Sequence, residues 1–292
     1  MASLKALRTR IRTVQETEKI TTAMMLVSGS KLRKAEINFK KASSFIKGFE
    51  MLLKDISTIE KSETLGIKLL QPLRGKAHHL VIVMTSDRGL CGTFNTLIIR
   101  DVKNYLKNLE EEGKTFSILL CGRKGRDLLK KNWEKCFLKE EMNFNTEKDP
   151  LKKASLMKAY IMNLYRTNMF EACTLFYSQF YSVMSQIPQK ETLIPILLNP
   201  LKESSSFCTP HELDSSPQEF LPPFLEMYLW TRLAHSLLQS EWSEQGARMM
   251  AMDGATRNAK EMTASLQLLY NRSRQATITK ELIEIISGSE AL

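Results

Sequence analysis

Residues 4–56, LKALRTRIRTVQETEKITTAMMLVSGSKLRKAEINFKKASSFIKGFEMLLKDI, hold the longest regular pattern in the chain. Apolar or small side chains recur there in alternating steps of three and four residues, which is the heptad spacing of a coiled-coil helix. The row consists of Leu4, Leu7, Ile11, Val14, Glu18, Thr21, Met25, Ser28, Leu32, Ala35, Phe39, Ala42, Ile46, Phe49, Leu53 and Ile56. At about 1.5 Å per residue, such a helix is on the order of 80 Å long. The stretch therefore predicts that residues 1–60 form one helix of a coiled coil.

Three polar residues interrupt this row, and a second apolar row appears at the interruption. The polar residues are Glu18, Thr21 and Ser28. The second row, Ile20, Met24 and Val27, is rotated away from the first, so this stretch has apolar side chains on more than one face. Two explanations are open: a local adjustment of the helix register, or contact with something other than the partner helix.

The C-terminal part of the chain carries a similar pattern. It begins at Pro222 and Pro223, which suit the start of a helix, and no proline follows them. The clearest row consists of Met252, Ala255, Ala259, Met262, Leu266, Leu269, Ser273 and Ala276. We therefore expect residues 222–292 to form the partner helix. Because the whole middle of the chain separates the two helices, they are expected to pair antiparallel.

The end of the chain, ATITKELIEIISGSEAL (residues 276–292), departs from the narrow row. Its apolar residues are Ile278, Leu282, Ile283, Ile285 and Ile286. At about 100° per residue these side chains spread around most of the helix circumference, so one partner helix cannot cover them. An apolar helix end of this kind predicts burial by an outside partner.

Residues 76–203 follow a different pattern, in which apolar runs alternate with helical segments. The runs predict strands at His79–Met84, at Phe116–Cys121, at Ala172–Phe180 and in LIPILLNP (residues 193–200), and helices are expected at Asn95–Leu109 and Lys152–Tyr165. This alternation is typical of an α/β domain with a mainly parallel sheet, similar to a Rossmann fold. Residues 204–221, rich in Ser and Pro, are predicted to form a loop. The fold class is thus an α/β domain plus a long antiparallel two-helix coiled coil.

The loops after the first two predicted strands stand where α/β proteins bind phosphate. SDRGLCG (residues 86–92) lacks the glycine spacing of dinucleotide-binding proteins, and no phosphate-binding loop motif occurs in the chain. CGRKGRD (residues 121–127) fits either a weak anion site or a tight turn with a solvated basic edge. The four histidines lack metal-ligand spacing, and no nucleophile motif is present. The sequence predicts no catalytic centre, metal or cofactor.

The composition indicates the net charge of the chain and the kind of compartment in which it is found. The 292 residues include 42 Lys and Arg against 32 Asp and Glu, a net charge of +10, which favours acidic partners. The five cysteines are scattered, so free thiols in a reducing compartment are expected. No apolar run is long enough to span a bilayer. The N-terminus has no apolar signal core and no separable presequence, which favours a bacterial protein.

Four segments resemble one family, the gamma subunits of F-type ATP synthases. They are QETEKITTAMMLVSGSKLRKAE (residues 15–36), TSDRGLCGTFN (residues 85–95), SEQGARMMAMDGATRNA (residues 243–259) and LLYNRSRQATITKELIEIISG (residues 268–288). The last is the family's signature region, and the order and spacing of all four also fit. The resemblance is strong over roughly the first sixty and the last fifty residues and weaker between them.

The resemblance implies a non-catalytic rotor shaft, one copy per complex, that couples proton flow to ATP synthesis. The two helices would lie inside a ring of alpha and beta subunits, and the α/β domain would rest on the epsilon subunit and the membrane c-ring. The protein would be peripheral, on the cytoplasmic side of the bacterial inner membrane. The implied ring contacts are Met24, Arg248, Gln275, Thr279 and Glu281, and the implied apolar bearing is Ile20, Val27, Ile278, Leu282, Ile285 and Ile286.

Two positions depart from the family pattern. Thr22 stands where the family usually has Lys, and Ser289 where it usually has Ala. The first change removes a cation that would face an acidic segment of the beta subunit.

Two other functions compete with the rotor interpretation. One is a nucleotide-dependent α/β enzyme built on residues 76–200, which the missing phosphate motif disfavours. The other is a coiled-coil protein whose basic helix binds DNA, which salt-dependent DNA affinity would reveal.

Overall fold

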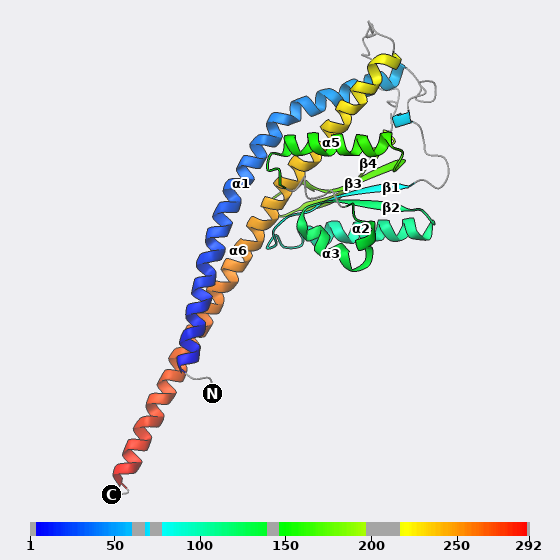
Figure 1. The fold of residues 1–292 in the computed structure, drawn as a ribbon. Coiled ribbons are helices and arrows are strands. Elements are labelled where there is room, and N and C mark those ends of the chain that lie inside the picture. The colour runs from blue at the N-terminus through cyan, green and yellow to red at the C-terminus, as the bar shows by residue number, and fades with distance from the viewer. Residues whose placement is uncertain (1–3, 60–67, 71–77, 139–145, 197–216, 291–292) are drawn as a thin grey trace. The chain divides into compact units, whose positions relative to one another are not determined.

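The computed structural model describes residues 4–59, 68–70, 78–138, 146–196 and 217–290 (Figure 1). The chain divides into two compact units. Residues 31–247 form the first, and residues 1–30 together with 248–292 form the second. The two long terminal helices, α1 (Leu4–Ile59) and α6 (Pro217–Glu290), contribute to both units.

A four-stranded sheet forms the centre of the first unit. Its strands are β1 (His79–Met84), β2 (Phe116–Cys121), β3 (Ala172–Phe180) and β4 (Gln186–Ile194), in the order β2-β1-β3-β4. β1 pairs in parallel with β2 and with β3, while β4 is antiparallel to β3. All six residues of β1 are buried, as expected for a strand covered on both faces. The mainly parallel sheet and the first three strands confirm the expectations from sequence.

The fourth strand was wrongly placed by the sequence. It was expected within residues 193–200, but β4 spans Gln186–Ile194 and returns from β3 as an antiparallel hairpin. Only its last two residues, Leu193 and Ile194, are buried. Because β4 is an edge strand with mostly polar residues, it lacks the apolar run that marks a central strand. Residues 197–200 of the expected strand lie outside the described residues.

Helices cover both faces of the sheet (Figure 1). α2 (Phe94–Glu111) and α3 (Arg123–Trp133) pack on one face, where they share a core with Val81 and Val83. α5 (Pro150–Arg166) and the first part of α6 pack on the other face, in a core that includes Leu80 and Ile82. Successive β1 residues thus serve opposite cores, as strand geometry requires. Short 3-10 helices lie at Lys68–Leu70 and Glu134–Cys136.

Helix α6 begins earlier than the sequence indicated. It starts at Pro217, so Pro222 and Pro223 lie inside the helix rather than at its start. Pro217 itself suits the first helical position, where its missing N–H costs no hydrogen bond. Of the predicted loop at residues 204–221, the last five residues are helical and the others lie outside the described residues.

Within each unit, α1 and α6 pair antiparallel. In the second unit, a cluster joins Leu7 and Ile11 to Leu266, whereas Thr21 lies farther along α1 and meets Thr256, earlier in α6. In the first unit, Phe39, Phe45 and Phe49 contact Trp242, Trp230 and Phe224 in turn, which is the same antiparallel order.

The seam on α1 was predicted well, and the seam on α6 was half wrong. On α1 the buried positions include Leu7, Ile11, Thr21, Ser28, Ala35, Ile46 and Leu53. On α6 the buried positions Met252, Ala259 and Leu266 were expected, but Met262 and Leu269 are 46% and 50% exposed.

Threonine and tyrosine take the places of the misassigned α6 residues. The positions that alternate with Met252, Ala259 and Leu266 are Thr256, Thr263 and Tyr270, which are buried or half-buried. The hydroxyls of Thr256 and Thr263 donate to carbonyls four residues earlier, at 2.8 and 2.9 Å. A satisfied hydroxyl can be buried at little cost, and for this reason hydrophobicity alone assigned the wrong face.

Candidate partner-binding surface

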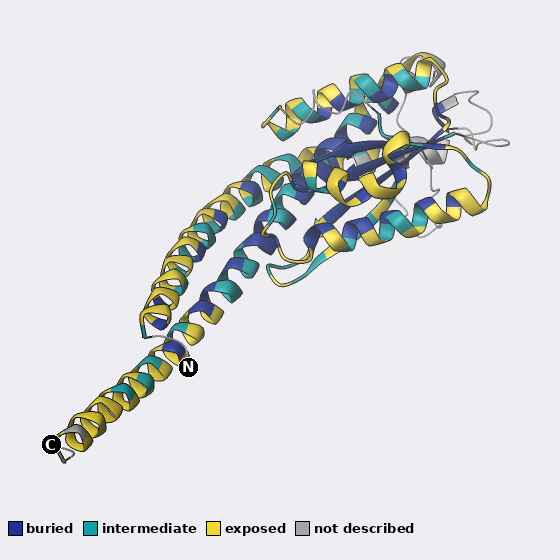
Figure 2. Cartoon of the chain, turned by 60° about the horizontal axis from the view of Figure 1, so that its bottom comes forward, coloured by how far each residue is buried: buried dark blue, intermediate teal, exposed yellow. Residues whose placement is uncertain are grey.

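The end of α6 presents an uncovered apolar surface. The exposed fractions are 48% for Ile278, 53% for Leu282, 57% for Ile283, 68% for Ile285 and 56% for Ile286. Figure 2 shows this end of the helix as almost entirely exposed. Large apolar side chains exposed around a whole helix are costly in water and mark a surface that another protein covers.

Polar side chains lie between these apolar residues. Gln275, Thr279 and Glu281 are exposed. The Thr279 hydroxyl donates to the backbone carbonyl of Gln275 at 2.9 Å, so it is satisfied within the helix. Lys280 and Glu284 form an ion pair of 3.5 Å one turn apart. The helix end thus offers both apolar area and polar groups to a partner.

The second apolar row on α1 is also exposed. Ile20 and Val27 are 60% and 56% exposed, while Met24 is half-buried. Leu26, which the sequence analysis did not single out, is 65% exposed and extends the same region. The consecutive apolar residues at positions 24–27 were the signal that could have indicated it. This region belongs to the paired part of the helices, since nearby Thr21 meets Thr256.

Arg248 is placed differently from the other predicted contact residues. It is buried, with 8% of its surface exposed, whereas Gln275, Thr279 and Glu281 lie on the uncovered helix end. The structure therefore brings three of the five predicted ring contacts onto one surface. Met24 and Arg248 lie elsewhere in the same unit.

The loops after β1 and β2 meet, but their glycines serve packing within the chain. The hydroxyl of Thr85 accepts a hydrogen bond of 2.9 Å from the N–H of Gly125. Gly122 has a φ of 109°, and a β-carbon there would lie 2.1 Å from the carbonyl oxygen of Thr85. Only glycine permits so close an approach.

The start of α3 is occupied by a carboxylate of the chain itself. Asp87 accepts a hydrogen bond of 3.2 Å from the N–H of Arg123, the first residue of α3. This carboxylate takes the position at the helix N-terminus where a phosphate binds in nucleotide-binding proteins. Of the two explanations for residues 121–127, the geometry favours a tight turn with a basic edge.

The described residues hold no group of three or more His, Cys, Asp or Glu side chains placed to bind a metal ion. Where the structure describes the chain, no helix is long and apolar enough to cross a membrane. The described cysteines, Cys91, Cys121, Cys136 and Cys173, are free thiols. Burial raises the pKa of the Cys173 thiol, which makes it a poor nucleophile.

These features define a class of protein: an α/β domain framed by its own two paired terminal helices, one of which ends in an uncovered apolar surface. Comparison with known proteins identifies the family. Residues 3–292 match the family described as ATP synthase. The chain is 41% identical to the ATP synthase gamma chain of Pelagibacter ubique and 39% identical to that of Methylobacterium nodulans, over the full length of both proteins in each case. The chain belongs to the ATP synthase gamma chain family.

A solved structure has the same fold. The cryo-EM structure of the Euglena gracilis mitochondrial ATP synthase, described as OSCP/F1/c-ring in rotational state 3, includes a similar chain with a TM-score of 0.63. The match covers 99% of this chain and 94% of that one, at 19% sequence identity. At this identity the match supports the fold, and the family assignment depends on the bacterial relatives.

Proposed function

We propose that this chain is the rotating central shaft of a bacterial F-type ATP synthase. The observation that carries the proposal is the uncovered apolar end of α6, in a chain whose family is that of the gamma subunits. A ring of alpha and beta subunits would cover this end. The shaft performs no chemistry itself, and it couples ion flow through the membrane sector to ATP synthesis on the ring.

The mechanism depends on the asymmetry of the helix pair. Three identical catalytic sites can be held in different states only by a partner that presents a different face to each of them. A helix end with Ile278 and Leu282 interleaved with Thr279 and Glu281 presents different chemistry in each direction. Rotation exchanges the face that each beta subunit meets, and so changes the nucleotide affinity of each site in turn.

Individual residues would take two roles at the ring. The exposed polar groups of Gln275, Thr279 and Glu281 are proposed to make hydrogen bonds that differ between rotational states. A bond to a charged group contributes about 1.5 to 3 kcal/mol. Met24 and Arg248 are proposed as further ring contacts, and Arg248 would need a side-chain rearrangement because little of it is exposed.

The exposed side chains of the apolar bearing are proposed to be buried against the ring, a contact that needs no directional bonds. Its members are Ile20, Val27, Ile278, Leu282, Ile285 and Ile286. Apolar burial stabilises contact by roughly 25 cal/mol per Å² and tolerates sliding, which suits a surface that must turn.

The remaining partners are proposed from the family. The α/β domain would contact the epsilon subunit and the c-ring, so the protein would lie at the membrane without entering it. The side of the membrane is proposed to be cytoplasmic, and the coupled ion is proposed to be the proton.

The test compares two variants in a reconstituted complex. Ile278→Ser/Leu282→Ser/Ile286→Ser removes apolar area from the bearing, whereas Lys280→Ala/Glu284→Ala removes the ion pair on the same turns. We expect the first variant to reduce ATP-driven proton pumping about tenfold, equivalent to roughly 1.4 kcal/mol, and the second to change it by less than half. Unchanged pumping in the apolar variant would contradict the bearing.

A separate measurement tests the assignment as a whole. The chain should co-purify with alpha and beta subunits, and it should not hydrolyse ATP when isolated. ATP hydrolysis by the purified chain would support the enzyme alternative instead. Salt-dependent DNA binding in place of co-purification would support the DNA-binding alternative.

A further inference from the structure

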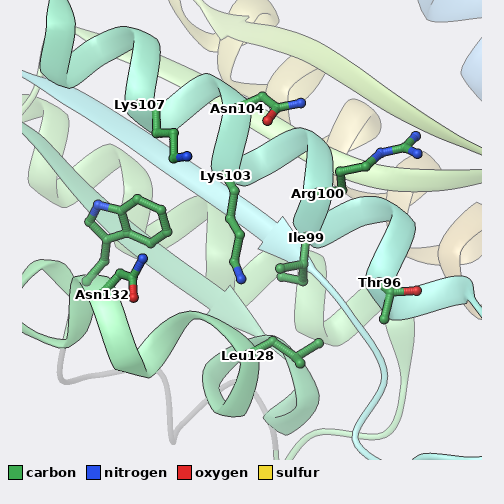
Figure 3. A pocket seen from close by; sticks show the side chains of 9 residues that line it. Thr96, Ile99, Arg100, Lys103, Asn104, Lys107, Leu128 and Asn132 are labelled. Carbon is green, nitrogen blue, oxygen red and sulfur yellow. The ribbon is translucent and has the colours of Figure 1, made fainter.

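A groove of about 490 Å³ lies between α2 and α3 in the unit that holds the sheet (Figure 3). We call it the α2–α3 groove. Its basic residues come from α2, and its apolar wall comes mainly from α3. Its basic residues are Arg100, Lys103 and Lys107, and α3 contributes Leu128, Asn132 and Trp133. A volume of this size is typical of small-molecule sites, which range over roughly 300 to 1,000 Å³.

The cations of the groove share one face of α2. Arg100, Lys103 and Lys107 follow each other at spacings of three and four residues, so they project from the same side of the helix. In Figure 3, Arg100 and Lys107 lie toward opposite ends of the groove, and Lys103 extends toward α3 between them. Like charges at these spacings repel each other, which an anion would relieve.

Two of these cations have no counter-charge in the described part of the chain. Among the described residues, no carboxylate lies within 4.0 Å of the amine of Lys103 or Lys107. Asp101 pairs with Arg100 itself at 3.4 Å. Three other acidic side chains nearby have partners other than the two lysines: Glu110 contacts the indole of Trp133 at 2.7 Å, Asp127 contacts Lys124 at 3.3 Å and Glu134 contacts Lys130 at 3.3 Å. The groove therefore carries a net positive charge that a bound anion would balance.

The other wall of the groove is apolar and fixed in place. The hydrogen bond between the indole N–H of Trp133 and Glu110 holds the ring, which is 5% exposed. Leu128 is 38% exposed and also lines the groove from α3. The exposed amide of Asn132 adds a hydrogen-bond donor and acceptor. A preformed apolar wall opposite a row of cations suits a ligand that has both a charged part and an organic part.

We propose that the α2–α3 groove binds a polyvalent phosphate anion, with its phosphate oxygens on Arg100, Lys103 and Lys107 and its organic part against Leu128 and Trp133. The guanidinium fork of arginine matches phosphate geometry, and lysines supply point charges at flexible distance. Two sources carry this chemistry: a nucleotide in solution and the headgroup of an anionic phospholipid. The site is independent of the proposed shaft function, since none of its residues belongs to α1 or α6.

The test titrates the purified full chain with pyrophosphate and with ATP, followed by calorimetry and by tryptophan emission. We expect saturable binding that Lys103→Gln/Lys107→Gln weakens about tenfold or more. The matched control, Lys130→Gln/Lys131→Gln, removes the same charge from exposed positions on α3 outside the groove, and it should change the affinity less than about twofold. Equal weakening by both variants would overturn the proposal, because net charge alone would then explain the binding.

A further arm distinguishes the two sources. Flotation with phosphatidylcholine vesicles, with and without phosphatidylglycerol, tests the lipid headgroup. If a nucleotide is the ligand, Leu128→Ser should weaken ATP binding more than pyrophosphate binding. If the lipid is the ligand, only the phosphatidylglycerol vesicles should retain the chain, and Lys103→Gln/Lys107→Gln should release it. Absence of binding to pyrophosphate, ATP and vesicles alike would overturn the proposal, with circular dichroism confirming that each variant is folded.

Discussion

At the scale of single residues, the turn after β2 is held by a contact that only glycine allows. Gly122 has a positive φ, and the space of its missing β-carbon is filled by the backbone of Thr85. The sequence showed two glycines in this loop, but it could not show whether they faced a ligand or the neighbouring strand. The structure favours the neighbouring strand.

Gly122→Ala is therefore expected to destabilise the chain by about 2 kcal/mol or more, because the new β-carbon meets Thr85 at an unfavourable φ. Gly48→Ala is the control, since Gly48 lies in α1 with nothing within 4 Å of its β-carbon position. It should be neutral or stabilising by up to about 1 kcal/mol. Urea unfolding of both variants measures the difference, and equal stabilities would contradict this account.

His235 is a second residue whose surroundings have a measurable consequence. It lies between the rings of Phe39 and Tyr177, with centroid distances of 5.5 and 6.4 Å, and its Nδ1 has no hydrogen-bond partner among the described residues. Burial, and then the positive charge of Arg232, lower its pKa from 6.5 to about 4. The folded chain thus holds this histidine neutral.

The pH dependence follows from that shift. Between pH 6.5 and about 4 the unfolded chain binds a proton at His235 and the folded chain does not, so stability falls as the pH falls through this window. Across the whole window, the free energy of unfolding falls by roughly 3 kcal/mol. In His235→Phe this contribution should disappear, so unfolding measured from pH 7 to pH 4 should show a smaller loss than in the unchanged chain. Parallel pH profiles for the two proteins would refute the assignment.

At the scale of elements, periodicity predicted α1 better than α6. The α1 row holds even at Thr21 and Ser28, which are buried at the positions where the sequence appeared to break the pattern. On α6 the same method chose Met262 and Leu269, which are exposed, because it assigned no burial to threonine. A hydrophobic pattern identifies a pair of helices reliably. It does not determine which face of each helix turns toward the other where the contact positions carry hydroxyl groups.

The paired hydroxyls of Thr21 and Thr256, 2.7 Å apart, test this explanation. Either single change to Val removes this contact, while the remaining hydroxyl keeps its bond to a carbonyl of its own helix, and should cost about 1 kcal/mol. The double variant should cost less than the sum of the two, because both single changes remove the same contact. The free energy of unfolding is measured for the unchanged chain, the two single variants and the double variant. Strictly additive costs would show that the contact between the two hydroxyls is unimportant.

The strands of the sheet also show where an apolar pattern in the sequence fails to predict the structure. β1, β2 and β3 were predicted because strands buried on both faces are continuous apolar runs. β4 was misplaced because an edge strand with polar residues resembles a loop. The groove between α2 and α3 left no signal at all, since its residues come from two segments that only the fold brings together.

At the scale of the whole molecule, α6 contains leucines of two kinds. Leu233 is completely buried in the core around the sheet, whereas Leu282 is 53% exposed on the uncovered end. The candidate surface could be predicted from sequence because its apolar residues fit no single helical face. Which polar residues share that surface required the structure, as the burial of Arg248 shows.

The same substitution at these two positions should separate folding from assembly. Leu233→Ala is expected to cost about 2 to 5 kcal/mol in the isolated chain, through lost burial and a cavity. Leu282→Ala should change the stability of the isolated chain by less than about 0.5 kcal/mol. Thermal unfolding measures the first effect, and incorporation into the complex measures the second, where Leu282→Ala should be the variant with the specific defect. A large loss of intrinsic stability in Leu282→Ala would mean that the chain itself covers the helix end.

The uncovered isoleucines at the end of α6 should also affect how quickly unassembled copies of the chain are degraded in a cell. A newly synthesised copy that has not met its partners displays the kind of apolar segment that chaperones and quality-control proteases bind. Unassembled copies should therefore be short-lived. The abundance of this chain is then expected to follow the supply of the proteins that cover the helix end, rather than the rate of its own synthesis.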